Sequence, residues 1–146
     1  MPIRREHRYF YPIGWKQLSA VIRFVRAGGR CEGCGRPHLQ DVQHLGDGRW
    51  WDGEAERWRD GRGRLVRRVL PAPEKMVAGT VKVTRVVLAT AHRNHDTADN
   101  SGVNLAAFCQ RCHMLHDRTE HQRRRRLTVR ARKAIGDLFS GLYPLR

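Results

Sequence analysis

The chain has few acidic residues and no long apolar run. Among its 146 residues, 29 are Lys or Arg and only 14 are Asp or Glu, so the formal net charge is +15. No apolar stretch is long enough to cross a membrane, and the first ten residues lack the apolar segment of a signal peptide. These absences predict an intracellular, cytoplasmic protein with no membrane partner, whose charge attracts a polyanion.

The positive charge favours nucleic acid as the partner, with duplex DNA before RNA. A solvated basic surface is the other interpretation of the charge alone. Arginine suits phosphate because its planar guanidinium group bonds two phosphate oxygens at once. We expect DNA contacts from Arg111, Arg118, Arg123, Arg124, Arg125, Arg126 and Arg130. A protein partner or a homodimer stays open.

The few cysteines are all in pairs. Cys31 and Cys34 form one pair and Cys109 and Cys112 the other, each with two residues between them. This is the spacing of zinc ligands, and in a reducing compartment it favours zinc over disulfides. We predict one structural zinc ion, because four thiolates leave no open coordination position. A Cys₃His site that includes His113, and cysteines that are free or redox-active, are the alternatives.

The spacing of apolar residues and the positions of turn residues predict the secondary structure of the first half of the chain. A helical stripe that faces the core is formed by Trp15, Leu18, Val21, Ile22 and Val25. Gly28 and Gly29 would end this helix. Residues 41–73 hold repeated Asp-Gly turn signals, which predict one or two short hairpins. Their tryptophans are expected to cover the core rather than to stack on bases.

The second half begins with a β-branched run. Residues 81–92 predict one strand, half or fully buried, followed by a loop at 93–103 and a short returning strand at 104–108. Cys109 would open a helix. Residues 119–146 predict a basic amphipathic helix that is docked through Leu127, Ala131, Ile135, Leu138 and Phe139.

The length indicates a single domain, 1–146. We divide it into a basic arm (1–14), a helix and zinc knuckle (15–40), an insertion (41–73), a core (80–118) and a basic C-terminal helix (119–146).

Several short motifs together resemble the HNH endonuclease family. They are Ala91-His92-Arg93-Asn94-His95-Asp96, Asn104-Leu105, Cys109-Gln110-Arg111-Cys112-His113, and Cys31-Glu32-Gly33-Cys34-Gly35 after a Trp-led helix. Zinc-stapled members of the family carry both cysteine pairs. Each motif is weak alone, but the combination is specific, and it spans residues 15–35 and 81–118.

The resemblance implies an α+β fold with a small ββα-metal, treble-clef-like core stabilised by zinc, flanking helices and a β-rich insertion. It implies hydrolysis of DNA phosphodiesters with one divalent cation, in the setting of a phage, mobile element or restriction system. His92 would be the general base, since histidine changes charge near neutral pH. Asn104 would brace the loop and orient His92, and His113 would hold the catalytic cation.

The residue spacing supports a cation site on the second helix. Asp117 lies four residues after His113, and His116 lies three after it, so all three share a face of a helix. Nitrogen and oxygen ligands suit Mg²⁺, Mn²⁺, Ni²⁺ or Zn²⁺.

One position departs from the family pattern. Many members place Asp or His, a metal ligand, directly before the base, where this chain has Ala91. His113 and Asp117 then hold the cation with the phosphate, or His95 or Asp96 reaches in, or the metal site is degenerate. An endonuclease is therefore the leading hypothesis. A non-catalytic zinc module that binds nucleic acid, or a nucleoprotein subunit, is the alternative, and an RNA-binding or ribosome-associated zinc protein is the third class.

Overall fold

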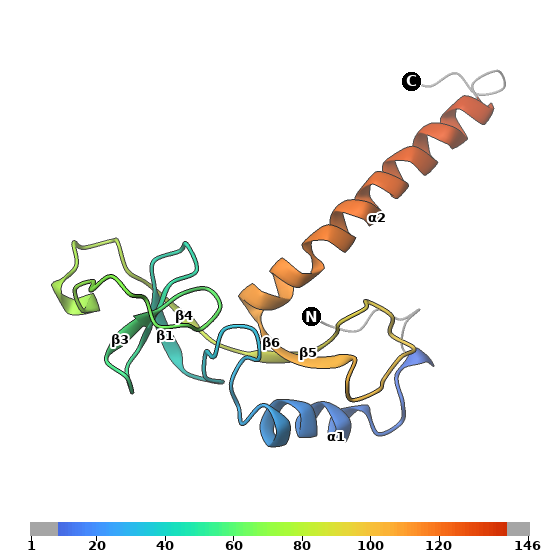
Figure 1. Cartoon of the computed structure of the whole chain (residues 1–146). Coiled ribbons are helices and arrows are strands. Elements are labelled where there is room, and N and C mark those ends of the chain that lie inside the picture. Colours follow the sequence, from blue (N-terminus) through green and yellow to red (C-terminus); the bar gives the residue numbers. More distant parts are fainter. Residues whose placement is uncertain (1–8, 140–146) are drawn as a thin grey trace. The chain divides into compact units, whose positions relative to one another are not determined.

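The structure is a computed structural model that describes residues 9–139, with the backbone alone for 135–139. This part of the chain is an α+β structure with two α-helices and two antiparallel sheets (Figure 1). It divides into two compact units, one ending at His113 and the other beginning at Met114. Residues 1–8 of the predicted basic arm and 140–146 of the predicted C-terminal helix lie outside the described residues.

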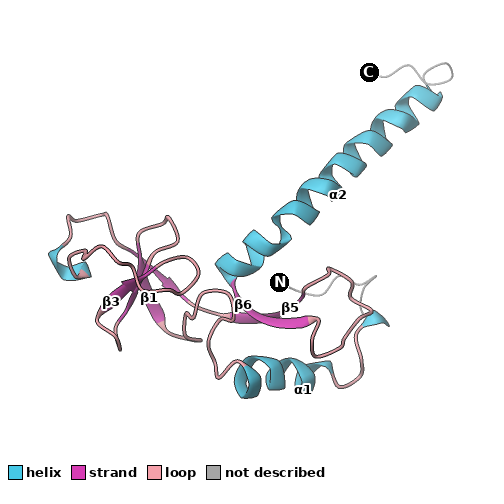
Figure 2. Ribbon diagram, in the orientation of Figure 1, coloured by secondary structure: helices cyan, strands magenta, loops and turns pink. Residues whose placement is uncertain are grey.

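Short strands dominate the first unit (Figure 2). The strands are β1 (Asp41–His44), β2 (Trp50–Asp52), β3 (Arg57–Arg59), β4 (Lys82–Arg85), β5 (Leu88–His92) and β6 (Leu105–Cys109). The helical elements are α1 (Trp15–Ala20), the π-helix η2 (Val21–Arg26), the 3₁₀ turn η3 (Pro73–Lys75) and α2 (Gln110–Phe139), which crosses into the second unit. No helix in the described residues is long and apolar enough to cross a membrane.

The first helix ends where the sequence predicts. Gly28 and Gly29 both have positive φ, 56° and 71°, a conformation that glycine adopts without steric cost. The predicted core stripe is wrong in part, because Val21 and Val25 are 49% and 77% exposed, whereas Ile22 is buried. The second half of the helix is a π-helix, whose wider turn rotates these side chains off the face that α-helical spacing assigns to them.

The insertion forms most of a four-stranded antiparallel sheet in the order β3-β2-β1-β4. Trp50 and Trp58 are 1% and 3% exposed, and Trp51 packs edge-on against Trp58. The Trp58 indole donates to the Pro71 carbonyl at 2.7 Å. These tryptophans therefore build the core of the insertion, as expected from the sequence.

The single strand predicted over 81–92 is two strands in two sheets. β4 pairs with β1, whereas β5 pairs with β6. The break falls at Val86, whose backbone bonds residues 39 and 40 and whose side chain is 2% exposed. The predicted burial also fails for β4. All four of its residues are exposed, because β4 is an edge strand with one neighbour.

The β5–β6 pair and the first helix enclose a small core. His92 pairs with Leu105 at one end of the two strands, and Leu88 pairs with Cys109 at the other. Leu105 and Ala107 are fully buried against Ile22, so the helix lies along one face of the pair (Figure 1). Apolar burial of this kind stabilises by about 25 cal/mol per Å². This core fixes the strand that ends at His92.

The second unit is helical. α2 begins at Gln110, directly after β6, and is continuous through the predicted boundary at residue 119. Residues 121–134 are all exposed, and Leu127 is 51% exposed. The predicted docking of this helix through an apolar stripe that includes Leu127 and Ala131 stays a prediction. The side chains of Ile135, Leu138 and Phe139 lie outside the description.

Candidate zinc and catalytic site

The four cysteines gather in the first unit as a candidate metal site. Their sulfur atoms lie within 4.8 Å of one another, and the Sγ atoms of Cys34 and Cys109 are 3.6 Å apart. A tetrahedron with Zn–S bonds of about 2.3 Å has edges of about 3.8 Å. The spacing of the sulfurs therefore fits one zinc ion, and three of the cysteines are buried with exposures of 3% or less.

Local backbone geometry aims the first pair. The N–H groups of Cys34 and Gly35 both donate to the Cys31 carbonyl, at 3.3 and 2.7 Å. Gly35 has φ 77°, which favours glycine. At Gly33 a side chain would place its Cβ only 3.0 Å from the Cys112 sulfur. The glycines of this knuckle are thus required by the turn and by the approach of the second pair.

The second pair lies where β6 runs into α2. The Cys109 N–H donates to the Cys31 sulfur at 3.2 Å. Hydrogen bonds from Cys112, then from Cys31 and Cys34, lower the pKa of the Cys109 thiol. Hydrogen bonding to Cys109, then to Cys31 and Cys34, raises the pKa of Cys112. A divalent cation favours the thiolate form of every sulfur that it binds. Binding of such a cation would therefore remove the difference between the pKa values of Cys109 and Cys112.

An ion pair links the knuckle to the first helix and to β6. Arg26 donates to both carboxylate oxygens of Glu32, at 3.1 and 2.8 Å, and to the carbonyls of Gly102 and Leu105, at 2.6 and 2.7 Å. Glu32 in turn accepts the Ala107 N–H at 2.6 Å. Glu32, which lies inside the first cysteine pair, thus bonds β6 directly. Through Arg26 it also supports the start of β6 and the end of the loop before it.

His92 is buried at the end of β5. Its ring is 5.5 Å from that of Trp15 and nearly parallel to it, and Tyr11 approaches edge-on at 5.7 Å. The residue is 7% exposed. Its Nε2 lies 3.0 Å from the Oδ1 of Asn100. Two aromatic rings and one amide therefore fix the orientation of the imidazole.

The hydrogen bonds of Asn100 decide the tautomer of His92. Its Nδ2 donates to the carbonyls of Phe10, Thr97 and Ala98 at 3.0, 3.2 and 3.3 Å, which assigns the amide nitrogen to that side. The amide oxygen then faces His92 and can only accept. Nε2 therefore carries the proton, and Nδ1 of the neutral ring is the atom able to take another.

Asn104 braces the loop between β5 and β6. Its Oδ1 accepts the Asn94 N–H at 3.1 Å, and its Nδ2 donates to the side chain of Asn94 and to the carbonyl of Asp99, at 2.9 and 2.8 Å. The sequence also assigns to Asn104 the orientation of His92, but the amide that bonds this imidazole belongs to Asn100. Both asparagines stand in the same Asn- and Asp-rich loop, and spacing alone does not distinguish them.

The cation ligands predicted from helical spacing lie on α2, whereas the alternatives His95 and Asp96 lie in the loop after β5. His113 is half-buried and lies near the start of α2, which begins at Gln110. His116 and Asp117 follow in the second unit, where the His116 Nδ1 is 3.0 Å from an Asp117 carboxylate oxygen. Ala91 is buried in β5, one residue before His92, and therefore on the opposite face of the strand.

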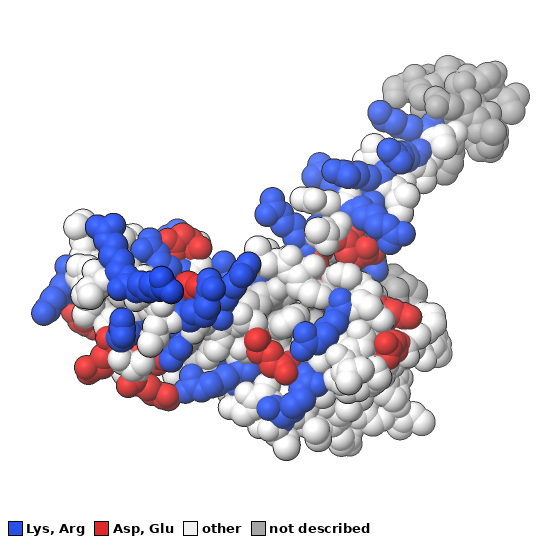
Figure 3. All heavy atoms as spheres, in the orientation of Figure 1, with Lys and Arg blue, Asp and Glu red and all other residues white. Residues whose placement is uncertain are grey.

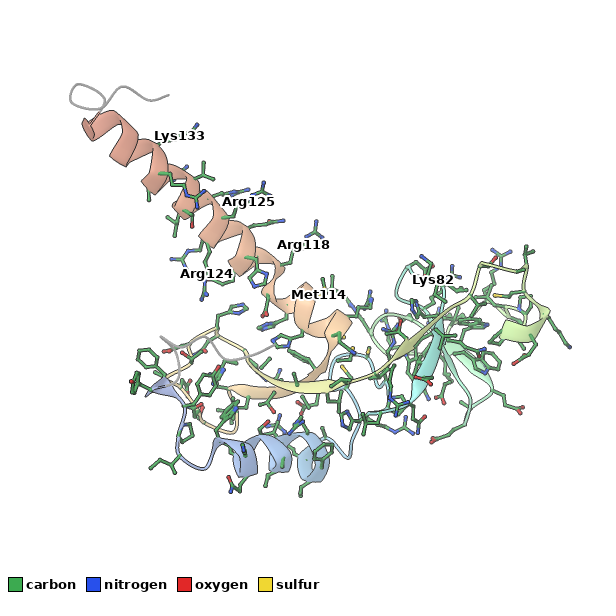
Figure 4. All side chains as sticks on the ribbon, turned by 180° about the vertical axis from the view of Figure 1, so that it is seen from behind. Lys82, Met114, Arg118, Arg124, Arg125 and Lys133 are labelled. Atoms are coloured by element: carbon green, nitrogen blue, oxygen red, sulfur yellow. The ribbon has the colours of Figure 1, made fainter. Side chains whose placement is uncertain are left out.

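Basic side chains line α2 (Figure 3). Exposed residues are Arg118, Arg123, Arg124, Arg125, Arg126 and Arg130, of which Arg118, Arg124 and Arg125 are labelled in Figure 4. Glu120 accepts from Arg123 and Arg124, at 3.3 and 2.7 Å. Arg111 differs from these residues because it is half-buried and donates to the Gly61 carbonyl at 3.3 Å, so part of its guanidinium group serves the fold.

Comparison of the chain with family models, with curated proteins and with solved structures finds no match. We therefore infer its function from its own residues. The sequence singles out His92 but not the residues that hold it, which are Asn100, Trp15 and Tyr11, and it does not reveal the Arg26–Glu32 pair. Two features of the sequence could have pointed to these residues. They are the aromatic residues just before and at the start of the first helix, and the charged residue inside the first cysteine pair.

Proposed function

We propose that this chain is a metal-dependent DNA endonuclease of the HNH type, with a ββα-metal, treble-clef-like core and a structural Cys₄ zinc ion. The order of elements supports this proposal: β5, the loop, β6 and α2 follow one another, as a ββα unit requires. The knuckle at Cys31 supplies half of the zinc ligands and the β6–α2 junction the other half. The proposal assigns zinc to the scaffold and the chemistry to the loop end of the β5–β6 pair.

The observation that carries the proposal is the fixed tautomer of His92. Its Nε2–H donates to Asn100, so Nδ1 is the basic atom of the ring. A general base must present an unprotonated nitrogen of defined direction to its water. The burial of the ring between Trp15 and Tyr11 holds that direction and restricts access to a small part of the ring.

In the proposed reaction Nδ1 of His92 takes a proton from water. The water oxygen then bonds to phosphorus as the bond from phosphorus to the 3′ oxygen breaks, and the 3′ oxygen leaves with the electron pair. His113, His116 and Asp117 would hold the catalytic cation, which would be Mg²⁺ or another divalent ion that offsets charge on the leaving oxygen. Asn104 keeps the loop in place through its bonds to Asn94 and Asp99.

DNA would be held mainly through its phosphates. The exposed arginines of α2 give the second unit a strong positive charge. Such contacts increase affinity for any duplex and carry no sequence information.

The test is plasmid cleavage by the wild type and by His92→Ala and His121→Ala, with EDTA, Mg²⁺, Mn²⁺ and Ni²⁺ in parallel. His121 is an exposed histidine of α2 and is the matched control. We expect metal-dependent nicking or linearisation by the wild type and by His121→Ala, and none by His92→Ala, which should still fold and bind DNA. Cleavage by His92→Ala at the rate of the control would refute the assignment of the base.

The second candidate is a non-catalytic zinc module that binds nucleic acid, within a nucleoprotein. Two observations favour it: Ala91 supplies no ligand, and His92 is only 7% exposed. Metal stoichiometry distinguishes the two candidates. The nuclease binds one zinc ion tightly and a second divalent ion more weakly, whereas the module binds only the first.

A further inference from the structure

Three cationic side chains and a histidine from separate segments lie around one turn of the insertion. Arg36 follows the zinc knuckle, His44 ends β1, Lys82 begins β4, and Arg111 is in the first turn of α2. His44 and Lys82 are direct partners in the β1–β4 register, so their side chains share one face of the sheet. Figure 4 labels Lys82 on this strand.

Two guanidinium groups meet at Gly48, in the turn between β1 and β2. Arg36 donates through Nη2 to the Gly48 carbonyl at 3.2 Å. The guanidinium group of Arg111 lies where a side chain at Gly48 would begin, and it donates to the Gly61 carbonyl at 3.3 Å. Both arginines thus bond backbone carbonyls, which leave their positive charges unneutralised.

No carboxylate among the described residues is within ion-pair distance of Arg36, His44, Lys82 or Arg111. The acidic residue that acts on His44 is Asp47, whose carboxylate is engaged by Arg49 at 2.6 Å.

The electrostatic effect on His44 shows that these charges are close together. Burial lowers the pKa of His44 first, and the charges of Arg36, Lys82 and Arg111 lower it further. Like charges held together raise the free energy of the fold unless an anion offsets them. Three arginines of the insertion, by contrast, are paired with carboxylates: Arg49 with Asp47, Arg59 with Asp52 and Arg64 with Asp60.

Arg36 adds a second observation. It is 7% exposed, and its buried Nε–H has no acceptor in the described part of the chain. A buried donor without an acceptor costs about 1–3 kcal/mol, so such groups usually have a partner. A guanidinium group with free N–H groups beside a second one suits the oxygens of a phosphate, which accept from several donors at once.

We propose that Arg36, Lys82 and Arg111 form, around His44, a binding site for a backbone phosphate of nucleic acid. The site uses none of the residues assigned to catalysis. That the phosphate belongs to DNA rests on the proposed function, whereas the site itself rests on the unneutralised charges around Gly48. Its role is to hold the duplex against the insertion sheet, which would give residues 41–73 a function beyond covering the core.

The first experiment is a titration of the zinc-loaded, ¹⁵N-labelled chain with inorganic phosphate, followed by NMR. We expect saturable shifts of the Gly48 and Gly61 amides and of the Nε–H resonances of Arg36 and Arg111. The amide of Lys75, an exposed basic residue just after the insertion, should not move. Shifts that are equal at Gly48 and Lys75, or that do not saturate, would overturn the site.

The second experiment measures duplex affinity against salt for Lys82→Ala and for the matched control Lys75→Ala. Loss of one phosphate contact lowers the slope of log K against log salt by about 0.9. We expect this change, with affinity weaker by at least about fivefold at low salt, in Lys82→Ala only. Equal effects of the two variants would show that Lys82 contributes only general charge.

Both experiments are independent of cleavage. Phosphate binding at Gly48 in a chain that cuts no plasmid would leave this site standing and refute the nuclease. Cleavage that depends on His92, without saturable phosphate shifts, would support the nuclease and refute the phosphate site.

Discussion

Removal of zinc is expected to unfold the first unit rather than to loosen one loop. Cys31, Cys34 and Cys109 are part of the core itself, in one cluster with Val42, Trp50, Val86 and Leu88. They join the insertion sheet to the β5–β6 pair, so the loss of the metal affects both sheets. The sulfur spacing of 3.6 Å between Cys34 and Cys109 already suits a bound zinc ion.

The magnitude follows from the scale of zinc binding. A structural zinc ion contributes about 10–16 kcal/mol of apparent binding free energy, which in such small domains is also folding free energy. The whole stability of a typical domain is only about 5–15 kcal/mol. Loss of the metal therefore removes as much free energy as the fold has to lose, and Cys109→Ser should have the same effect.

The assay combines zinc release with thermal unfolding. A chelator should release one zinc ion per chain and abolish the cooperative far-UV circular dichroism transition of the first unit. Added Zn²⁺ should restore the transition, whereas Ca²⁺ should not, because it prefers oxygen ligands. A chelated protein that melts within a few degrees of the zinc-loaded one, or a stable zinc-free Cys109→Ser protein, would refute the reasoning.

Substitutions at three further positions test the support around the two sites. Trp50→Phe removes the hydrogen bond from its indole to the Cys34 carbonyl, 3.1 Å long and buried, and should lower the free energy of unfolding by about 1–3 kcal/mol in urea denaturation. Arg26→Ala removes two short bonds, to the carbonyls of Gly102 and Leu105, from a side chain that is 35% exposed, so we expect a loss of about 2 kcal/mol by the same measurement; an unchanged midpoint would contradict this role. Asn100→Ala should slow plasmid cleavage about 10- to 100-fold, because the imidazole of His92 loses its acceptor, whereas Asn100→Asp keeps the acceptor and should retain most of the rate. Equal rates of the two Asn100 variants would argue against the tautomer assigned to His92.

Local spacing in the sequence determined much of the fold. Two residues between the cysteines of each pair are enough to predict a common metal site, and the structure brings the four sulfurs together. Gly28 and Gly29 end the first helix because their left-handed backbone is costly for other residues. A β-branched run followed by Asn, Asp and Gly residues likewise located the end of the strand at His92 and the loop after it, although the run holds two strands.

Other features depend on partners that are distant in the sequence. Val86 divides a β-branched run into two strands only because residues 39 and 40 bond its backbone from another segment. Arg111 is one of many arginines in the sequence of α2, and nothing nearby distinguishes it from the others. Yet its side chain bonds the carbonyl of Gly61, 50 residues earlier in the chain.

The sequence by itself determined the local elements and the ligand set, because turn preferences and the spacing of metal ligands act over a few residues. Only the tertiary structure decided which asparagine holds His92, which arginine is drawn into the fold and where the unneutralised charge gathers. Those outcomes depend on which side chains meet in space, and a hydrogen bond or a charge interaction forms at short distance whatever the separation along the chain.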